Sequence, residues 1–533
     1  MSESLSTART TPGETLKDAF ETSLRKYADR TALEAGDGSL TYRELDRRAN
    51  AVAHALVAQG VGVGDRVALV MSNRLEYVIA DLAIVKAGAA KLPLNDMLTA
   101  DEFEFMLADS GTGTVICGPN FTETIASIQA ALPAVETVIG IGDASPEEFI
   151  AFESMAGDRS DPPSQSPSPE DVAGHYYTGG TTGKPKGVLH EQAGLTTNVY
   201  AHIVELGITG DDTLLLMTPL PHSAGMFLWG ALLNGATSVI RPGFEPATAL
   251  ELIDRHAVTW TFMVPTMIYR LLDHPTLASA DTSSLESLVY GAAPMTPARL
   301  REGLEAFGPV FLQFYGQTEV PNLITTLGKA EHRNAVETGH TERLSSAGYP
   351  CLMADVRIVD SETGAPSDGL EVGESGEILA TAPYTMTEYY ERPDATEETV
   401  VDGWVRTGDI GRLDEDGYVY LLDRASDLII SGGMNVYSTE VEEALDEHEA
   451  VREVAVIGVP HDDWGEAVTA IVVPHDGAVT EAEILSFADE ALADYKKPKS
   501  VEFRESIPKT PYGKMDKRAL REPYWEDEER EVG

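Results

Sequence analysis

The chain has very little cysteine. Cys117 and Cys351 are its only two cysteines in 533 residues. A disulfide framework or a cysteine-based metal site needs several cysteines at short, regular spacings, so both classes are excluded. We expect both thiols to lie in the hydrophobic core, where free cysteine is usually found.

The chain also lacks long apolar runs. No run approaches the about 20 residues that a membrane-spanning helix needs. The first seven residues, Met1-Ser-Glu-Ser-Leu-Ser-Thr7, lack the basic region followed by an apolar region that marks a secretory signal. We therefore expect a cytoplasmic protein without integral membrane contact.

Basic residues are scarce relative to acidic ones. The sequence has 39 Lys and Arg against 87 Asp and Glu, which gives a formal net charge of −48. Nucleic acid is excluded as a partner, because its phosphates would be repelled. The acids are spread along the whole chain, as in proteins from a salt-loaded cytoplasm where counterions screen the self-repulsion. This favours a halophilic origin over an ordinary acidic mesophilic protein.

The length and the residue pattern predict an α/β protein with more than one domain. A chain of 533 residues exceeds what one core usually covers. Apolar runs near 67–71, 238–241, 287–290 and 310–314 read as buried strands, each followed by a loop. A capping box from Thr41 to Glu44 begins a helix between such strands. This alternation indicates doubly wound sheets, whose ligand sites lie at the carboxyl ends of the strands.

The pattern changes after residue 424. The following hundred residues have strands of their own near 454–459 and 468–473, and a capping box from Thr480 to Glu483. We therefore predict a large N-terminal domain at 1–424 and a small α+β domain at 425–533. The junction between them is the expected hinge.

A segment rich in glycine, threonine and lysine is the most informative motif. It reads Tyr177-Thr-Gly-Gly-Thr-Thr-Gly-Lys-Pro-Lys-Gly187. Glycine lets several backbone N–H groups turn toward an anion, while threonine hydroxyls and lysine add donors and charge. The common P-loop needs Ser or Thr after Gly-Lys, whereas Pro185 follows Lys184 here. The motif therefore predicts a different kind of loop for nucleotide phosphates, and not a flexible linker.

Five motifs in a fixed order resemble one superfamily. They are 177–187, Phe314-Tyr-Gly-Gln-Thr-Glu319, Trp404-Val-Arg-Thr-Gly-Asp409, Asp423-Arg424 and Gly513-Lys514. Together they resemble the adenylate-forming (AMP-binding) ligases, and within them the AMP-forming acyl-CoA synthetases. The resemblance extends over residues 15–520. It implies that the large domain also contains a small distorted β-barrel and that the C-terminal domain is mobile.

The resemblance implies that ATP binds to residues from several segments of the large domain, between 178 and 424. The loop would surround the β- and γ-phosphates, Tyr315 would stack on adenine opposite Gly291-Ala-Ala293, and Asp409 would bind the ribose with help from Arg424. The full nucleotide set is Thr178, Gly179, Gly180, Thr181, Thr182, Gly183, Lys184, Lys186, Gly291, Ala292, Ala293, Tyr315, Gly316, Gln317, Asp409 and Arg424.

The same resemblance implies the catalytic roles. Thr318 would contact the α-phosphate, Glu319 would hold Mg²⁺, and Lys514 would bridge the carboxylate and the α-phosphate. Gly433 would line the tunnel for coenzyme A after the small domain rotates. The hinge position, commonly Asp or Lys in the family, is Ser426 here, a small polar residue that can absorb a change in φ and ψ.

The acyl group is assigned to the motif Pro219-Leu-Pro-His-Ser-Ala-Gly225. The resemblance implies that His222 gates the pocket, although a hydrogen-bonded core histidine is the alternative. Met226, Phe227, Trp229 and the Gly316-Gln317 backbone would form an apolar wall. No Asp stands where amino-acid-activating relatives keep one, so an apolar fatty or aryl acid is expected.

The predicted function is ATP-dependent conversion of a carboxylic acid, through an acyl-adenylate, to an acyl-CoA. ATP, Mg²⁺, coenzyme A and the acid are the expected ligands. Two alternatives remain: an adenylation enzyme that loads a separate carrier protein, and a non-catalytic protein that binds adenylate or acyl-CoA. The sequence leaves the oligomeric state open between a monomer and a homodimer.

Overall fold

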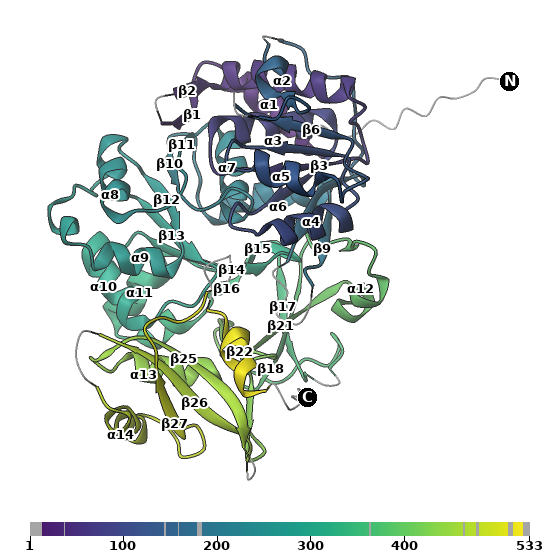
Figure 1. Cartoon of the computed structure of the whole chain (residues 1–533). Coiled ribbons are helices and arrows are strands. Elements are labelled where there is room, and N and C mark those ends of the chain that lie inside the picture. Colours follow the sequence, from purple (N-terminus) through teal and green to yellow (C-terminus); the bar gives the residue numbers. More distant parts are fainter. Residues whose placement is uncertain are drawn as a thin grey trace.

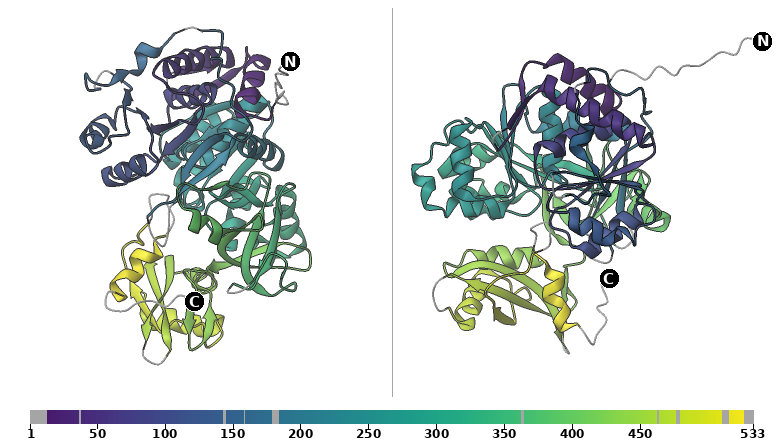
Figure 2. Two further views of the ribbon diagram at one scale, coloured as in Figure 1. Left: turned by 90° about the vertical axis from the view of Figure 1, so that its right-hand side faces the viewer. Right: turned by 45° about the horizontal axis from the view of Figure 1, so that its top comes forward.

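The computed structural model describes residues 13–36, 38–142, 145–157, 159–178, 184–361, 364–461, 464–475, 479–509 and 515–525. Three sheets and their helices make up the large N-terminal part, and a fourth sheet belongs to a smaller C-terminal unit at one end of the molecule (Figures 1 and 2). The α/β class predicted from the sequence is confirmed.

The first sheet has nine strands in the order β16-β15-β14-β13-β12-β10-β11-β1-β2. Its middle is parallel from β1 to β14, and the edge strands β2, β15 and β16 are antiparallel. The bounds are β1 Thr31–Ala35, β2 Gly38–Thr41, β10 Thr213–Leu216, β11 Thr237–Ile240, β12 Trp260–Met263, β13 Ser287–Gly291, β14 Phe311–Gln317, β15 Val320–Leu327 and β16 Tyr349–Pro350.

The second sheet has eight strands in the order β19-β9-β8-β4-β3-β5-β6-β7. It is parallel from β8 to β7, while β9 pairs antiparallel with both β8 and β19. The bounds are β3 Arg66–Val70, β4 Ala90–Leu94, β5 Thr114–Cys117, β6 Thr137–Gly140, β7 Ile150–Ala151, β8 Val172–Tyr177, β9 Gly187–Glu191 and β19 Glu388–Tyr389.

Side-chain alternation along these strands creates separate hydrophobic cores. Leu214 and Leu216 face one core, whereas Leu215 faces another. In the second sheet Val67 and Ala68 divide in the same way. Successive residues of a strand point to opposite faces, so a continuously apolar strand must be covered on both sides.

Helices fill these layers. The core that joins the two sheets contains buried residues of α1 Leu16–Lys26, α2 Tyr42–Ala58, α3 Leu75–Ala87, α6 Gln192–Glu205 and α7 Ser223–Asn234. The outer face of the first sheet is covered by α8 Pro246–Arg255, α9 Pro265–Leu272, α10 Pro297–Phe307 and α11 Lys329–Thr338. The outer face of the second sheet is covered by α4 Ala100–Asp109 and α5 Thr122–Gln129.

The predicted helix starts and buried thiols are confirmed. Thr41 and Glu44 form a capping box at the start of α2, and Thr480 and Glu483 form another at the start of α14 Glu481–Ala491. The two cysteines, Cys117 and Cys351, are buried and unpaired.

The third sheet is antiparallel. The resemblance implied a small distorted β-barrel within the large domain, and the structure has a five-stranded sheet there. Its strand order is β17-β18-β21-β20, with β22 also paired to β21. The bounds are β17 Asp355–Val359, β18 Ser375–Thr381, β20 Val400–Val401, β21 Trp404–Leu413 and β22 Val419–Arg424, with α12 Pro393–Thr399 before β20. Ile378 and Val405 from this sheet belong to the same core as the two larger sheets.

The C-terminal unit has its own sheet and core. The strand order is β24-β23-β26-β25, with β27 beside β26. The bounds are β23 Ile429–Ser431, β24 Met434–Val436, β25 Val451–His461, β26 Gly465–Pro474 and β27 Ser500–Phe503, with α13 Ser438–Asp446 and α15 Lys517–Arg521 packed near them. The boundary predicted at 424/425 falls between β22 and β23. Short 3-10 turns lie at Phe152–Met155, Pro275–Ser279, Thr341–Ser345 and Glu522–Tyr524.

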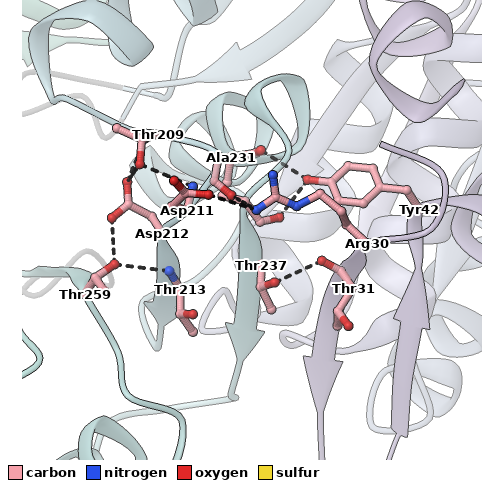
Figure 3. A network of polar contacts seen from close by, with 12 residues as sticks. Arg30, Thr31, Tyr42, Thr209, Asp211, Asp212, Thr213, Ala231, Thr237 and Thr259 are labelled. Atoms are coloured by element: carbon pink, nitrogen blue, oxygen red, sulfur yellow. Dashed lines mark hydrogen bonds and ion pairs between the residues drawn. The ribbon is translucent and has the colours of Figure 1, made fainter. Parts of the chain in front are cut away.

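Polar side chains fasten the amino ends of strands in the first sheet (Figure 3). Asp212 Oδ1 accepts a hydrogen bond of 2.6 Å from the Thr259 hydroxyl, and the Thr237 hydroxyl donates to Thr31 O at 2.9 Å. The buried Tyr42 hydroxyl donates to Ala236 O at 2.7 Å. These contacts stabilise the amino ends of the strands. Ligands bind at the opposite, carboxyl ends in such folds.

Candidate active site

The stem of the predicted phosphate loop is a hairpin between β8 and β9. Tyr177 pairs with Gly187, and Thr178 N–H donates to Lys186 O at 3.0 Å. The loop therefore starts at the carboxyl end of β8, which is parallel to β4. Gly179, Gly180, Thr181, Thr182 and Gly183 lie outside the described residues, so their predicted phosphate contacts stay predictions.

The two lysines of the loop lie against aromatic rings. Lys184 is exposed, with its Nζ atom 5.1 Å from the centroid of the Phe105 ring. Lys186 is partly buried, with Nζ 4.4 Å from the centroid of the Tyr389 ring. Such cation–π contacts hold each ammonium group without neutralising its charge.

Tyr389 also contacts the predicted metal ligand. Its hydroxyl donates a 2.5 Å hydrogen bond to Oε1 of Glu319, whose side chain is buried. Burial, followed by the Glu319 charge, raises the pKa of Tyr389, so the hydroxyl stays protonated and can donate. Tyr389 thus contacts both a loop lysine and the acidic group, a link that the sequence reasoning missed.

Glu319 and Thr318 lie in the turn between β14 and β15, with no helix at that point. The Thr318 carbonyl accepts a 2.8 Å hydrogen bond from Nε2 of His190 on β9. Burial lowers the pKa of His190 to about 4, so a neutral imidazole donates this bond. His190 was not predicted, because its place in the sequence gives no sign of the turn that it fixes.

Residues from the first and third sheets form a second polar cluster. The Tyr315 hydroxyl donates to Oδ2 of Asp409 at 2.6 Å, and Nε of Arg424 lies 3.2 Å from Oδ1 of the same carboxylate. Asp409 and Arg424 are directly paired between β21 and β22. The Asp409 charge raises the pKa of Arg424, and burial followed by Asp409 raises the pKa of Tyr315.

The backbone is tight at the ends of β13 and β14. A side chain on Gly291 would meet the Phe314 carbonyl oxygen, 2.6 Å from the Cβ position. A side chain on Gly316 would meet the Asn322 backbone at 2.4 Å. The next residue after Gly291, Ala292, is exposed and has a φ of 67°. Glycine is therefore required at both strand ends for close approach.

The predicted acyl-pocket residues point in different directions. His222 precedes α7 as its N-cap and is partly buried, as Gln317 is, and Met226 is buried. Phe227 packs edge-on against Phe262 and Phe314, at centroid distances of 5.0 and 5.6 Å.

Trp229, on the same helix, has other neighbours. Its indole N–H donates to Oδ2 of Asp81 at 2.7 Å, and Nζ of Lys91 lies 3.8 Å from a Trp229 ring centroid. Lys91 and Asp81 form a buried ion pair with a 3.0 Å N–O distance. Phe227 and Trp229 therefore do not share one wall, and a role for Trp229 beside the acid stays a prediction.

The junction of the C-terminal unit is held by buried charges. Oδ2 of Asp423 accepts from the backbone N–H and the hydroxyl of Ser438, at 2.6 and 2.8 Å. Nζ of Lys517 lies 2.6 Å from that hydroxyl and 2.7 Å from Oε1 of Glu442. Burial raises the pKa of both Asp423 and Glu442, and the positive charge of Lys517 partly offsets this rise. The sequence reasoning missed Lys517, whose partners are distant in the chain.

The remaining predicted residues of this unit lie near its start. Ser426 is partly buried, and its carbonyl accepts a 3.2 Å hydrogen bond from Arg521. Gly433 lies in the exposed turn between β23 and β24 with a φ of 76°. Lys514 is outside the described residues. The hinge, tunnel and catalytic assignments therefore stay predictions.

A Mg²⁺ ion fits the donor set only together with a nucleotide. Among the described residues, no group of three or more His, Cys, Asp or Glu side chains could hold a metal ion. Glu319 is a buried carboxylate that makes no ion pair with a Lys or Arg among the residues that the structure describes. Mg²⁺ is commonly bound by one or two carboxylates plus phosphate oxygens and water, so Glu319 is a suitable protein ligand.

The fold and the clusters define a protein of two parts, with polar clusters at the carboxyl ends of β8 and β14. Family models for the AMP-binding enzyme and the AMP-binding enzyme C-terminal domain match residues 20–390 and 440–514. The chain belongs to the AMP-binding, adenylate-forming ligase superfamily.

Curated relatives span nearly the whole chain. The medium/long-chain fatty acid–CoA ligase FadD8 of Mycobacterium tuberculosis is 35% identical over 96% of this chain and 90% of its own length. A feruloyl-CoA synthase of Amycolatopsis sp. is 38% identical over 92% and 95%. A fatty acid–acyl-carrier-protein ligase, ScoC of Streptomyces coeruleorubidus, is 35% identical over 93% of each chain.

A solved structure has the same architecture. The amide bond synthetase McbA of Marinactinospora thermotolerans superposes with a TM-score of 0.86 and 32% identity, covering 96% of this chain and 99% of McbA. Within the described residues, no helix combines the length and the apolar character needed to cross a membrane.

Proposed function

We propose that the protein is an AMP-forming acid–CoA ligase that acts on a fatty or aryl carboxylic acid. In the first step a carboxylate oxygen attacks the α-phosphorus of ATP, and pyrophosphate leaves. In the second step the thiol of coenzyme A attacks the acyl carbonyl, AMP leaves, and the thioester forms. The relatives support the class of reaction but include both fatty and aryl acids.

The observation that supports this proposal best is the cluster of Tyr315, Asp409 and Arg424. Tyr315 lies 94 residues before Asp409 in the sequence, and Arg424 is on the next strand, yet one carboxylate contacts both partners. A carboxylate held in this way can accept both hydroxyls of a ribose, while the Tyr315 ring contacts the base. The Glu319 charge also contributes to the raised pKa of Arg424, after Asp409 and other neighbours.

The phosphate end has the charges that the first step needs. Lys184, Lys186 and the backbone at Thr178 would surround the β- and γ-phosphates, and Thr318 would contact the α-phosphate. Mg²⁺ bound at Glu319 would neutralise phosphate charge. Lys514 would neutralise the approaching carboxylate, because a flexible ammonium group can reach both oxygens.

The second step requires the C-terminal unit to move. Lys514 would leave the site, and rotation near Ser426 would bring Gly433 beside coenzyme A. Asp423, before the proposed pivot, accepts hydrogen bonds from Ser438 after it, so this contact crosses the hinge.

A panel of acids tests the proposal directly. The protein is incubated with ATP, Mg²⁺ and mixed fatty and aromatic acids in concentrated KCl, with and without coenzyme A, and products are identified by mass spectrometry. Acyl-CoA plus AMP is the expected result. An adenylate that never reaches coenzyme A would favour a carrier protein or an amine as acceptor, as the names of ScoC and McbA suggest.

The role of Lys514 has its own test. Lys514→Ala should abolish adenylate formation, because no other group neutralises the carboxylate during attack, yet it should largely spare thioester formation from supplied acyl-adenylate. Pyrophosphate release and acyl-CoA formation are measured separately. Equal loss of both half-reactions, or an unaffected first step, would contradict the role assigned to Lys514. A wild-type protein that forms no adenylate from any acid would favour a non-catalytic binding protein.

A further inference from the structure

A chain of hydrogen bonds joins α6, β15 and α7 beside the proposed acyl site. Nδ1 of His202 lies 2.7 Å from Asn198 O, and Nε2 lies 3.0 Å from Nδ2 of Asn322. Oδ1 of Asn322 accepts a 2.8 Å hydrogen bond from the Ser223 hydroxyl. Three helix and strand segments thus meet at one side-chain amide.

The direction of every bond in this chain is fixed. The carbonyl of Asn198 can only accept, so Nδ1 of His202 must be the protonated nitrogen. Nε2 then accepts from the Asn322 amide, and that amide turns its oxygen toward Ser223. Complete burial lowers the pKa of His202 to about 4, which keeps this neutral tautomer at neutral pH.

The chain leaves hydrogen-bonding capacity on its exposed side. Asn322 uses one of its two N–H groups on His202, and the Ser223 oxygen still has its lone pairs. Both residues are partly exposed, whereas His202 is fully buried. Asn322 therefore keeps one N–H donor and Ser223 keeps acceptor lone pairs, on two partly exposed side chains that are hydrogen-bonded to each other.

These two residues lie where the acyl group is proposed to bind. Ser223 directly follows His222 at the start of α7, and the Asn322 backbone lies against Gly316. Phe227 packs edge-on against His202, with the ring centroids 5.6 Å apart. On the neighbouring strand end, Nε2 of Gln317 is buried and has no hydrogen-bond partner among the described residues. Polar groups thus lie beside the buried aromatic cluster around Phe227.

Backbone geometry alone does not explain the amide. Asn322 has a φ of 64°, and asparagine is one of the residues that tolerate this left-handed conformation. Glycine would adopt it more easily, without placing an amide between a histidine and a serine. The side chain therefore has a role beyond the turn.

We propose that Asn322 and Ser223 form a polar subsite that binds a hydroxyl or carbonyl oxygen on the body of the substrate acid. The substrate class is then an oxygen-substituted aryl or alkyl acid, in preference to the unsubstituted acid of the same shape. The inference rests on the proposed ligase function, because it concerns the same acyl site. A site that hydrogen-bonds a substrate oxygen discriminates strongly against the analogue without it, since its own polar groups are left unpaired.

Matched pairs of acids test this subsite. The full-length protein is assayed for ATP-dependent pyrophosphate release with 3-phenylpropanoic acid against its 4-hydroxy derivative, and with octanoic acid against 8-hydroxyoctanoic acid. In at least one pair, kcat/KM should be about tenfold or more higher for the hydroxylated acid. Equal or higher values for the plain acid in both pairs would overturn the inference while leaving the ligase function intact.

Two variants separate recognition from folding. Asn322→Gly keeps the left-handed backbone and removes the amide, and Ser223→Ala removes the hydroxyl. Each should lower the ratio of kcat/KM for the hydroxylated acid to kcat/KM for the plain acid about tenfold. A purely structural network would instead lower kcat/KM for both acids by the same factor, so that this ratio stays unchanged. If the wild-type protein forms no adenylate from any acid, the proposed function itself fails.

Discussion

At the scale of single residues, the site depends on side chains that contact two partners at once. Tyr389 touches both Lys186 and Glu319, and Asp409 touches both Tyr315 and Arg424. Each of these central residues is almost fully buried. Because a buried polar group must keep its hydrogen bonds, small substitutions at these positions should have specific effects on ligand binding.

The Tyr389 hydroxyl should strengthen the binding of Mg²⁺ by Glu319. Tyr389→Phe removes the hydrogen bond to Glu319 but keeps the ring under Lys186, so the carboxylate loses its orienting donor. Groups that orient a metal ligand typically contribute tenfold or more to metal affinity. We expect the Mg²⁺ concentration for half-maximal adenylation to rise about tenfold, and Mg²⁺–ATP to raise the melting temperature less than in the wild type.

The neighbouring tyrosine provides a matched control. Tyr390 lies with its ring 4.2 Å from the Arg66 guanidinium, and its hydroxyl makes no hydrogen bond to the residues that the structure describes. Tyr390→Phe should leave the Mg²⁺ dependence unchanged. The same shift in both variants would show that the effect is not specific to Glu319.

The Asp409 carboxylate should dominate ribose binding. Asp409→Asn keeps the shape and one acceptor but loses the charge that pairs with Arg424. Charge-assisted hydrogen bonds contribute about 1.5–3 kcal/mol, so AMP and ATP should bind roughly 10–100-fold more weakly. Calorimetric titration measures this affinity. Asp416→Asn, at an exposed loop position, is the control and should bind nucleotide normally.

At the scale of elements, helix α13 concentrates negative charge at the boundary between the two parts of the molecule. Its Asp446 interacts with Thr296 and Arg299 at the start of α10, in the large N-terminal part. Burial, followed by Glu440, Glu442, Asp446 and Glu447, raises the pKa of Glu443 to about 7. This helix should therefore respond to pH.

The direction of the response follows from the raised pKa. In the unfolded chain Glu443 would titrate near 4.5, and in the folded protein it titrates near 7. The ionised form is thus disfavoured by folding, so this residue costs stability at pH 8, and the cost disappears as the pH falls from about 7 toward 4.5. Glu443→Gln should raise the melting temperature at pH 8 and change it little at pH 5.

The matched control for this prediction is Glu449→Gln, which removes the same charge from an exposed position just after the helix. It should have a small effect at both pH values. Melting is followed at constant KCl, because salt also screens the repulsion. A stabilisation of Glu443→Gln that is independent of pH would contradict the assigned pKa.

At the scale of the whole molecule, the dominant feature is a net charge of −48. Repulsion among the acids opposes the compact state unless counterions screen it. The screening length falls from about 10 Å at 0.1 M salt to about 3 Å at 1 M. We expect the melting temperature and the adenylation rate to rise together between 0.1 and 2 M KCl. Full activity and an unchanged melting temperature at low salt would contradict the halophilic interpretation.

The sequence by itself determined the class of fold and the order of the motifs. Apolar runs of strand length, capping boxes such as Thr41 to Glu44, and the glycine-rich segment are local signals, and each depends on residues only a few positions apart. Their order along the chain was enough to indicate the superfamily, which the family models then confirmed.

Only the tertiary structure decided which side chains meet. The contact of Tyr389 with Glu319 joins residues 70 positions apart, and that of Asn322 with His202 joins residues 120 apart. The sequence also did not show which way each side chain of α7 points. Phe227 and Trp229 were both predicted to line the acyl pocket, yet Trp229 hydrogen-bonds to Asp81. Such contacts follow from how sheets and helices stack, and no local pattern in the chain encodes that.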